Sequence, residues 1–403
     1  MAAPAFAVGE PQNGFPTWAE RMVHEWMNRA RVDPQVEMAA CGSACGDAAC
    51  YAPVPPLAWD VRLNRSARFH SDEMVQQNYF GHPSSCTVVS NIDAIYPASC
   101  QGAASCACEG GTSTCGASGC TQPQDRVSLF GASFSGEIIA GGGDPNDAFY
   151  LWLYEPIPKT TSCGYIQGNG QPGTTNGHRY NILESMGGVG VGVSLGGQYG
   201  GDYTGDFDFN GPAPAQIPSG SHYPRQAATV DAWANWYDTT GPKSALVDVD
   251  GACTPMKLER GSAMNGAYHA ALSGVGSGCH RYYFVFADGA GQPVTFPTTG
   301  SLGIGPEDGT CADWDSSRPA EGAGCSCTPS CAEKSCGDDG CGGSCGVCPG
   351  SDGGLPGSGD QGGDGGTGGS TGGGCDVGGP SLPAGALLFG LALFALALRR
   401  RAG

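Results

Sequence analysis

Apolar residues in the first half of the chain recur at the spacing of an α-helix. Segments 17–34 and 57–77 each place a row of residues on one helical face, namely Trp18, Met22, Trp26 and Ala30 in the first and Leu63, Ala67, His70 and Met74 in the second. A third helix should begin with Asp144 as N-cap and Pro145 at its first position. Two short strands, 189–195 and 203–209, follow. Residues 15–210 are therefore predicted to form an α+β domain in which helices outnumber strands.

Alternation of apolar and polar residues with a period of two replaces the helical pattern in residues 211–305. Gly, Asp and Pro separate the alternating segments, so we expect a small all-β sandwich that resembles an immunoglobulin or fibronectin domain. Cys253 and Cys279 are expected to form its internal disulfide. A sugar-binding surface is an alternative interpretation of its aromatic residues, but core packing is favoured for Trp233, Trp236, Tyr282 and Tyr283.

The C-terminal quarter lacks both patterns. Residues 306–348 hold eight cysteines and few apolar residues, which predicts a small disulfide-rich module. Residues 349–374 are so rich in glycine that they predict a flexible linker. In the tail 375–403, the segment 382–398 has 17 residues without a charge. As a helix it would span roughly 26 Å, near the lower limit for crossing a bilayer, so one C-terminal transmembrane helix is expected.

The cysteine content changes the picture of the compartment. Twenty-one cysteines in 403 residues indicate a disulfide framework in an oxidising, extracytoplasmic environment. Zinc ribbons are the alternative, but they need paired CxxC motifs, and the chain has one, at Cys345 and Cys348. The first domain holds ten cysteines, the sandwich two and the disulfide-rich module eight, so each is expected to pair its own cysteines. Cys375 is left over.

Charge and the N-terminus add two further expectations. The net charge is −19 without a basic stripe in the globular part, which argues against a nucleic-acid partner. The small-residue pattern Ala5, Phe6, Ala7 resembles the end of a signal peptide. We therefore hypothesise that the true start and the rest of the signal lie upstream.

Four side chains able to do chemistry lie on separate predicted elements of the first domain. His82 follows the first pair of helices, Glu137 lies in FSGEIIAGGG, Glu155 ends the helix that begins at Pro145, and His178 lies in NGHRYNIL. The glycines after Glu137 suggest a tight turn. The order His, Glu, Glu, His is the pattern on which a family resemblance rests.

Motifs around these residues resemble the CAP superfamily of cysteine-rich secretory, antigen 5 and pathogenesis-related proteins, also called SCP-like domains. They are LNRSARFHSDEMVQQNYFGH, GEIIAGGG, LWLYE and GHRYNILES, followed by GVGVGVSL. The resemblance implies an α-β-α sandwich with a central cleft that holds His82, Glu137, Glu155 and His178. One position departs from the family, which usually has GENI where this chain has GEII. Ile138 replaces an amide, so the local polar network should differ.

The chemistry of the four residues leaves two uses open. Two neutral imidazoles suit a divalent ion such as Zn²⁺, with His82 and His178 as candidate ligands. Glu137 and Glu155 could then act as catalytic bases on a bound water, or as partners that orient the imidazoles. A purely structural role for the His–Glu pairs is the third interpretation. The other histidines have no matching partner in the sequence and are expected to be structural or exposed: His24, His70, His222, His269 and His280.

Two insertions flank the candidate cleft. Residues 84–124 begin two positions after His82 and carry six cysteines, and residues 156–177 separate Glu155 from His178. Both should therefore emerge beside the cleft and determine which ligands it admits.

The tail resembles a MYXO-CTERM sorting signal. It has GGGC ending at Cys375, a spacer, the apolar run and a basic cluster, Arg399, Arg400 and Arg401. The basic cluster places the far end in the cytoplasm, and the resemblance implies recognition by a membrane protease, cleavage, and surface display or release.

Three functions are consistent with the sequence. The favoured one is a surface-displayed, non-enzymatic protein that binds a small lipid, glycan or protein partner in the His/Glu cleft. The alternatives are a zinc-dependent, peptidase-like hydrolase that uses the same cleft and a structural envelope protein.

Overall fold

The computed structural model describes residues 15–97, 100, 107–116, 119–155, 177–184, 186–320, 325 and 331–332. Most of the predicted disulfide-rich module, the linker and the sorting tail with its transmembrane helix lie outside these residues. Within the described ranges, no helix is both long and apolar enough to cross a membrane.

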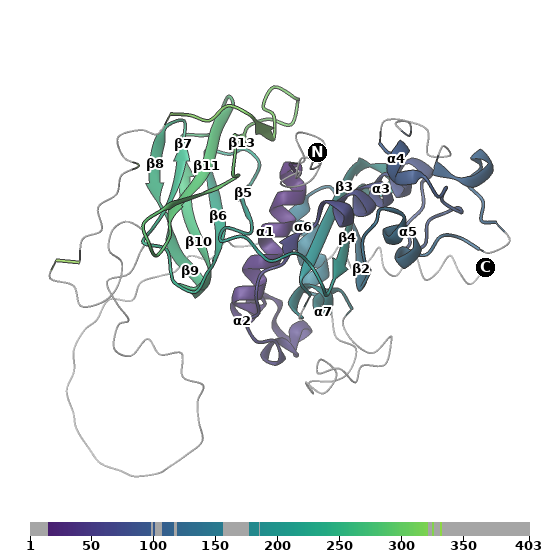
Figure 1. Ribbon diagram of the computed structural model, residues 1–403, viewed down its shortest axis with the longest axis horizontal. Helices are drawn as coiled ribbons and strands as arrows, with labels where there is room; N and C mark the ends of the chain where they lie inside the picture. Colours follow the sequence, from purple (N-terminus) through teal and green to yellow (C-terminus); the bar gives the residue numbers. More distant parts are fainter. Residues whose placement is uncertain are drawn as a thin grey trace, which may run out of the picture. The chain divides into compact units, whose positions relative to one another are not determined.

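The first domain is built on a four-stranded sheet with the order β1-β3-β4-β2 (Figure 1). β1 pairs with β3 in parallel, and the other pairs are antiparallel. Helix α3 contacts β3 and β4 on one face, whereas α1, α6 and α7 contact β2 or β3 around a common hydrophobic core. The bounds are β1 Ala58–Trp59, β2 Gly136–Gly141, β3 Gly188–Gly196, β4 Gly200–Asp208, α1 Trp18–Val32, α2 Pro34–Glu37, α3 Val61–Gln77, α4 Ile92–Ile95, α5 Pro123–Leu129, α6 Pro145–Leu153 and α7 Gly177–Leu183. The expected α+β class is confirmed.

Local signals explain where the long helices begin. Thr17 and Glu20 form a reciprocal capping box at the start of α1. Asp144 caps α6 and Pro145 occupies its first turn, as predicted. The apolar faces predicted from residue spacing in α1 and α3 are both buried.

The alternating glycines of β3 allow α3 to lie directly on the sheet. A side chain at Gly190 would place its β-carbon 1.9 Å from the backbone nitrogen of Asn64, and one at Gly192 would lie 2.1 Å from that of Arg68. Valines at the alternate positions point to the opposite face, where Val189 and Val191 join the core under α1. The close approach brings His70 on α3 to 4.0 Å from Glu137 on β2.

The second part of the described chain forms two antiparallel sheets that share one hydrophobic core. The first sheet has the order β5-β6-β10-β9, and the second has the order β14-β13-β11-β7-β8 with β12 paired to β11. The strands are β5 Gly220–Tyr223, β6 Thr229–Tyr237, β7 Ser244–Val249, β8 Ala252–Pro255, β9 Lys257–Ser262, β10 Asn265–Ser273, β11 His280–Ala287, β12 Pro293–Phe296, β13 Ser301–Ile304 and β14 Trp314–Asp315. β14 comes from the segment expected to be a separate disulfide-rich module, yet Trp314 packs in the sandwich core.

The aromatic residues considered for sugar binding are all buried. Trp236 and Tyr282 lie in the sandwich core, Tyr283 is fully buried, and Trp233 faces the first domain. The sugar-binding interpretation of these four residues is therefore wrong, because no ring offers a free face.

Helix α1 is buried on both sides, since the outer face of β5, β6, β10 and β9 packs against it. Asn28 on α1 donates to Ser219 Oγ at 3.0 Å, and the indole of Trp18 donates to the His222 carbonyl at 2.9 Å. The α+β domain and the sandwich are thus joined by an interface that contains buried, hydrogen-bonded polar side chains.

The predicted disulfide Cys253–Cys279 is wrong. Cys253 pairs with Cys325, and Cys279 pairs with Cys311. Cys253 lies on β8 and Cys279 directly precedes β11, and β7 separates those two strands. Strands that are two apart lie about 9–10 Å from each other, too far for a disulfide. Both bridges therefore tie the sandwich to the segment that follows it, and the expectation that each module pairs its own cysteines is also wrong.

Peptide mapping should recover this pattern. Digestion of the non-reduced protein, followed by mass spectrometry, is expected to yield cross-linked peptides containing Cys253 with Cys325 and Cys279 with Cys311. A peptide that links Cys253 to Cys279 would contradict the structure.

Candidate functional site

Glu137 lies in the edge strand β2, which ends at Gly141, the first of the glycines that follow Glu137. Its side chain is 1% exposed, and its Oε1 accepts a hydrogen bond of 2.8 Å from Nδ1 of His82, whose side chain is 46% exposed. Because neighbouring residues of a strand point to opposite faces, Ile138 enters the core under α1. The departure from the family at Ile138 therefore lies away from the His82–Glu137 pair.

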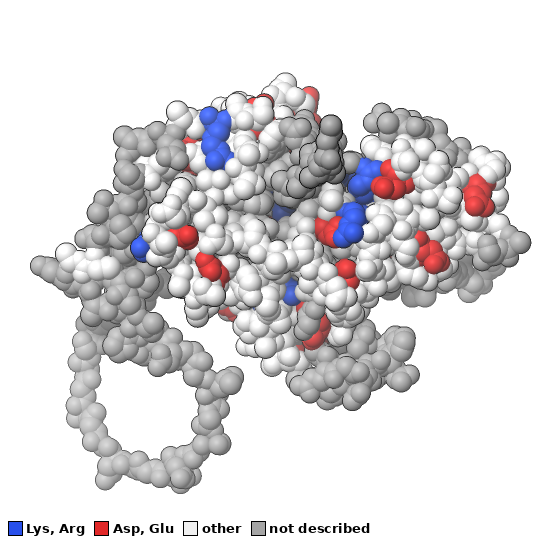
Figure 2. Space-filling model, viewed as in Figure 1, with Lys and Arg blue, Asp and Glu red and all other residues white. Residues whose placement is uncertain are grey.

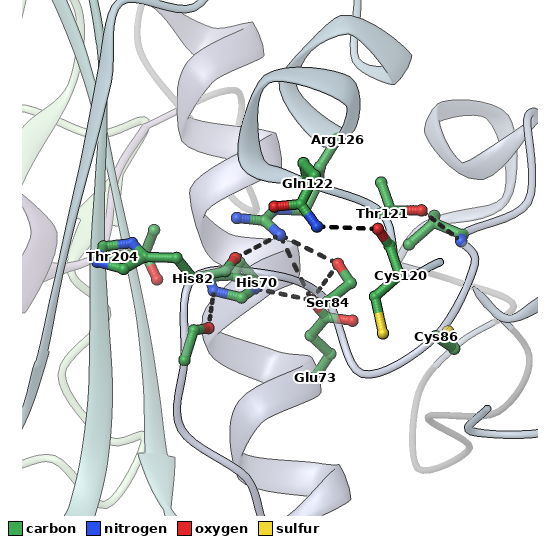
Figure 3. Close-up of polar contacts among 12 residues, drawn as sticks. His70, Glu73, His82, Ser84, Cys86, Cys120, Thr121, Gln122, Arg126 and Thr204 are labelled. Carbon is green, nitrogen blue, oxygen red and sulfur yellow. Dashed lines mark hydrogen bonds and ion pairs between the residues drawn. The ribbon is translucent and has the colours of Figure 1, made fainter. Parts of the chain in front are cut away.

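Arg126 on α5 contacts both members of this pair, and Figure 3 shows its guanidinium beside His82 and Ser84. Its Nη2 donates to Glu137 Oε2, while Nη1 donates to the His82 carbonyl at 3.1 Å and to Ser84 Oγ at 3.0 Å. Burial alone would raise the pKa of Glu137, but the positive charge of Arg126 and the neighbouring histidines lower it to about 2. Glu137 is therefore ionised at neutral pH.

His70 and Glu73, both on α3, extend the cluster. His70 Nδ1 lies 2.7 Å from Glu73 Oε1, and its Nε2 lies 3.0 Å from the Gly81 carbonyl and 4.0 Å from Glu137. Both close partners offer acceptor oxygens, so both ring nitrogens of His70 lie in hydrogen-bond contact. The expectation that His70 lacks a partner is wrong. The other four histidines also have partners. His24 contacts the Leu57 carbonyl and His222 contacts Tyr282. His269 lies between Asp231 and Glu259, and His280 pairs with Asp250.

Asp206 on β4 is a second buried carboxyl, directly opposite Glu137 in the strand register. Burial and the negative charge of Glu137 raise the pKa of Asp206 well above its ordinary value. The Arg126 guanidinium thus lies among three buried carboxyl groups, those of Glu73, Glu137 and Asp206.

His178 and Glu155 form a second pair. His178 lies in the first turn of α7, Glu155 follows the end of α6, and His178 Nδ1 is 3.0 Å from Glu155 Oε2. The two atoms are at ion-pair distance but are not aligned as a hydrogen bond. The side chains are 29% and 37% exposed, so this pair is more open to solvent than Glu137.

The two pairs lie on elements that touch. Helix α7 packs on β2, and a β-carbon at Gly136 would fall 2.3 Å from Oδ1 of Asn181, one turn after His178. Gly136 must therefore stay without a side chain for α7 to approach Glu137. Even so, among the described residues no three of the four predicted side chains bring donor atoms within 4.8 Å of one another. The structure thus shows two adjacent His–Glu pairs and not one closed four-residue cluster.

The insertion after His82 is closed at its base. Ser84 donates its backbone N–H to Thr121, and Thr121 donates to Cys86, at 3.0 and 3.1 Å. The disulfides Cys86–Cys108 and Cys115–Cys120 lie within the loop. Its base thus adjoins the first pair. The second insertion, apart from Gly177, lies outside the described residues.

Surface charge around the domain is dispersed. On the face shown in Figure 2, the described acidic and basic residues occur singly or in small groups on a largely uncharged surface. Recognition at the two pairs therefore depends on local contacts.

The comparisons with known proteins agree with the resemblance seen in the sequence. Residues 24–207 match the family model CAP, described as the cysteine-rich secretory protein family. The matched range contains both His–Glu pairs. No curated protein matches the chain.

Proposed function

Because residues 24–207 are a CAP domain, we propose that this protein is a surface-displayed binding protein of the CAP superfamily. The domain and the disulfides indicate an extracellular protein. Its ligand, a small lipid, a glycan or a protein segment, binds at the two His–Glu pairs together with a divalent metal ion.

The observation that carries the proposal is the shared orientation of the two imidazoles. His82 and His178 each turn Nδ1 toward a carboxylate, and among the described residues Nε2 of each ring has no partner. In the first pair the hydrogen bond from Nδ1 to Glu137 favours the tautomer that leaves the Nε2 lone pair free. In the second pair Glu155 lies at ion-pair distance behind Nδ1, so both rings present Nε2 to a ligand or an ion.

The donor set fits an open metal site and not a closed structural one. His82 and His178 would supply two nitrogen ligands, and Glu137 and Glu155 would orient them. Zn²⁺ accepts such ligands, and it would supply Lewis acidity toward an oxygen of the bound partner. Since no three of these four side chains bring donor atoms within 4.8 Å of one another, water or the ligand would complete the coordination.

The state of Glu137 favours binding over hydrolysis. A general base works best with a pKa near the working pH, whereas the pKa of Glu137 is about 2 and both of its oxygens are occupied by Arg126 and His82. The hydrolase alternative therefore rests on Glu155 alone.

Display on the cell surface is the remaining part of the proposal, and it rests on the sequence of the tail. The glycine-rich linker would hold the globular part away from a membrane, and the apolar run would anchor it until processing near Cys375.

Zinc titration of the metal-free protein by calorimetry tests the proposal. Wild type should bind one Zn²⁺. Glu155→Gln should weaken binding by roughly 10–100-fold, because it removes the partner that orients His178, and His82→Gln should weaken it by at least as much. His280→Gln is the matched control, since this histidine also faces a carboxylate but lies on β11 of the sandwich.

Unchanged zinc affinity in His82→Gln and Glu155→Gln would overturn the metal part of the proposal. Phospholipid vesicles and a glycan panel, probed with wild type and His82→Gln, then distinguish the ligand classes. Equal retention of the two proteins on every probe would favour the structural alternative.

A further inference from the structure

We infer that two buried arginines position the two His–Glu pairs independently, Arg126 for His82–Glu137 and Arg179 for His178–Glu155. The consequence for ligand binding rests on the proposed function. The positioning itself concerns the ligand-free protein and can be measured without any ligand.

Arg126 contacts both members of the first pair with one guanidinium. It donates to the Glu137 carboxylate, to the His82 carbonyl and to Ser84 Oγ, and its side chain is fully buried. These acceptors come from two separate segments, the strand β2 and the loop after α3. A planar group with several fixed donors therefore determines how far His82 lies from Glu137.

Arg179 holds the backbone around the second pair. It follows His178 in α7 and is fully buried. Its Nε donates to the Leu153 carbonyl at 2.7 Å, and its Nη2 donates to the Glu155 carbonyl at 2.6 Å. Arg179 thereby ties the backbone after α6, which includes Glu155, to α7, the helix that carries His178.

Each arginine is anchored to a different disulfide-bonded segment. Arg126 reaches Ser84, whose backbone closes the base of the Cys86–Cys108 loop. Arg179 forms an ion pair with Asp47 and contacts Cys45 Sγ at 3.0 Å, next to the Cys41–Cys45 bridge. Because these anchors lie in different disulfide-bonded segments, loss of one arginine should leave the other pair in place.

Lysine cannot replace either arginine in this role. A lysine ammonium keeps the positive charge, but its single nitrogen cannot span a carboxylate and a carbonyl in the fixed geometry of a guanidinium fork. Arg126→Lys and Arg179→Lys therefore keep the positive charge, but the His–Glu pair beside each substituted residue is no longer held in a fixed position.

Histidine ring signals in NMR spectra of the full chain without metal test the inference. Signals are assigned with His82→Gln and His178→Gln. Arg126→Lys should shift the His82 ring signals and leave those of His178 unchanged, and Arg179→Lys should do the reverse. Arg68→Lys is the control, because Arg68 forms a comparable two-point contact with Glu20 away from both pairs.

Two outcomes would overturn the inference: a folded Arg126→Lys variant with unchanged His82 signals, or equal shifts at both histidines in either variant. If Arg126→Lys does not fold, Ser84→Ala decides, since removal of one Arg126 contact should shift His82 alone. Zinc titration of the same samples separates the two proposals. Selective shifts without zinc binding support the positioning role and count against the proposed function.

Discussion

Replacing Glu25 by glutamine is expected to stabilise the protein by about 3 kcal/mol at pH 7. Glu25 lies on α1 where the sandwich packs, and it is fully buried. Burial raises the pKa of Glu25 to about 8, although Ser219 and Arg29 act in the opposite direction. Glutamine has the same shape and never has to lose a proton.

The sign follows from proton binding. The folded protein keeps the Glu25 proton up to about pH 8, whereas the unfolded chain releases it near pH 4.5. Wild-type stability should therefore fall as the pH rises through this window, by about 1.4 kcal/mol per unit. The difference between Glu25→Gln and wild type should be absent at pH 4 and grow toward pH 8.

Urea denaturation with intact disulfides at pH 4, 6 and 8 measures this difference. Glu259→Gln is the control with the opposite sign, because the hydrogen bond from His269 lowers the pKa of Glu259. That variant should lose stability at neutral pH. A Glu25→Gln protein no more stable than wild type at pH 8 would show that Glu25 is not held protonated.

Features fixed by neighbours in the sequence were predictable. The buried faces of α1 and α3 follow from apolar spacing, and the start of α6 follows from Asp144 and Pro145. Strand β2 was not predicted, because the glycines after Glu137 suggested a turn. Gly136 and Gly141 bound the strand. These two glycines allow other side chains to lie close to the strand, since a β-carbon at Gly136 would clash with Asn181 and one at Gly141 would clash with Tyr199.

The family resemblance identified the four side chains of the site, but it did not identify the residues that surround them. The pair His70–Glu73 could have been recognised, because residues three apart share one face of a helix. Arg126 and Asp206 have no such signal. Arg126 reaches Glu137 from α5, and Asp206 faces it through the register of β2 with β4. Both contacts depend on tertiary structure.

The joint between the two parts of the chain was also hidden. Apolar spacing predicts one buried face of α1 and gives no sign that the opposite face is buried too. In the structure the sandwich packs on that opposite face, with Trp233 of β6 against α1. The even number of cysteines in each module suggested that every module pairs its own cysteines. The disulfide between Cys253 and Cys325 joins two of these modules instead.

Arg29→Ala at this joint should destabilise the protein by about 3–5 kcal/mol. The Arg29 guanidinium lies 4.0 Å from the ring centre of Trp26 and 4.7 Å from that of Trp233. It also donates to Glu37 from Nε at 3.0 Å, and both side chains are buried. Its charge lowers the pKa of Glu37 against the effect of burial, so alanine leaves an uncompensated carboxylate in the interface.

Arg62→Ala is the matched control. Arg62 pairs with Asp60 at 2.8 Å, but its side chain is 56% exposed, and exposed pairs contribute about 0–1 kcal/mol. Urea denaturation should therefore separate the two variants by several kcal/mol. The double variant Arg29→Ala, Glu37→Gln should recover part of the loss, because it removes the unpaired charge. Equal losses in Arg29→Ala and Arg62→Ala would mean that the sandwich does not bury Arg29 in solution.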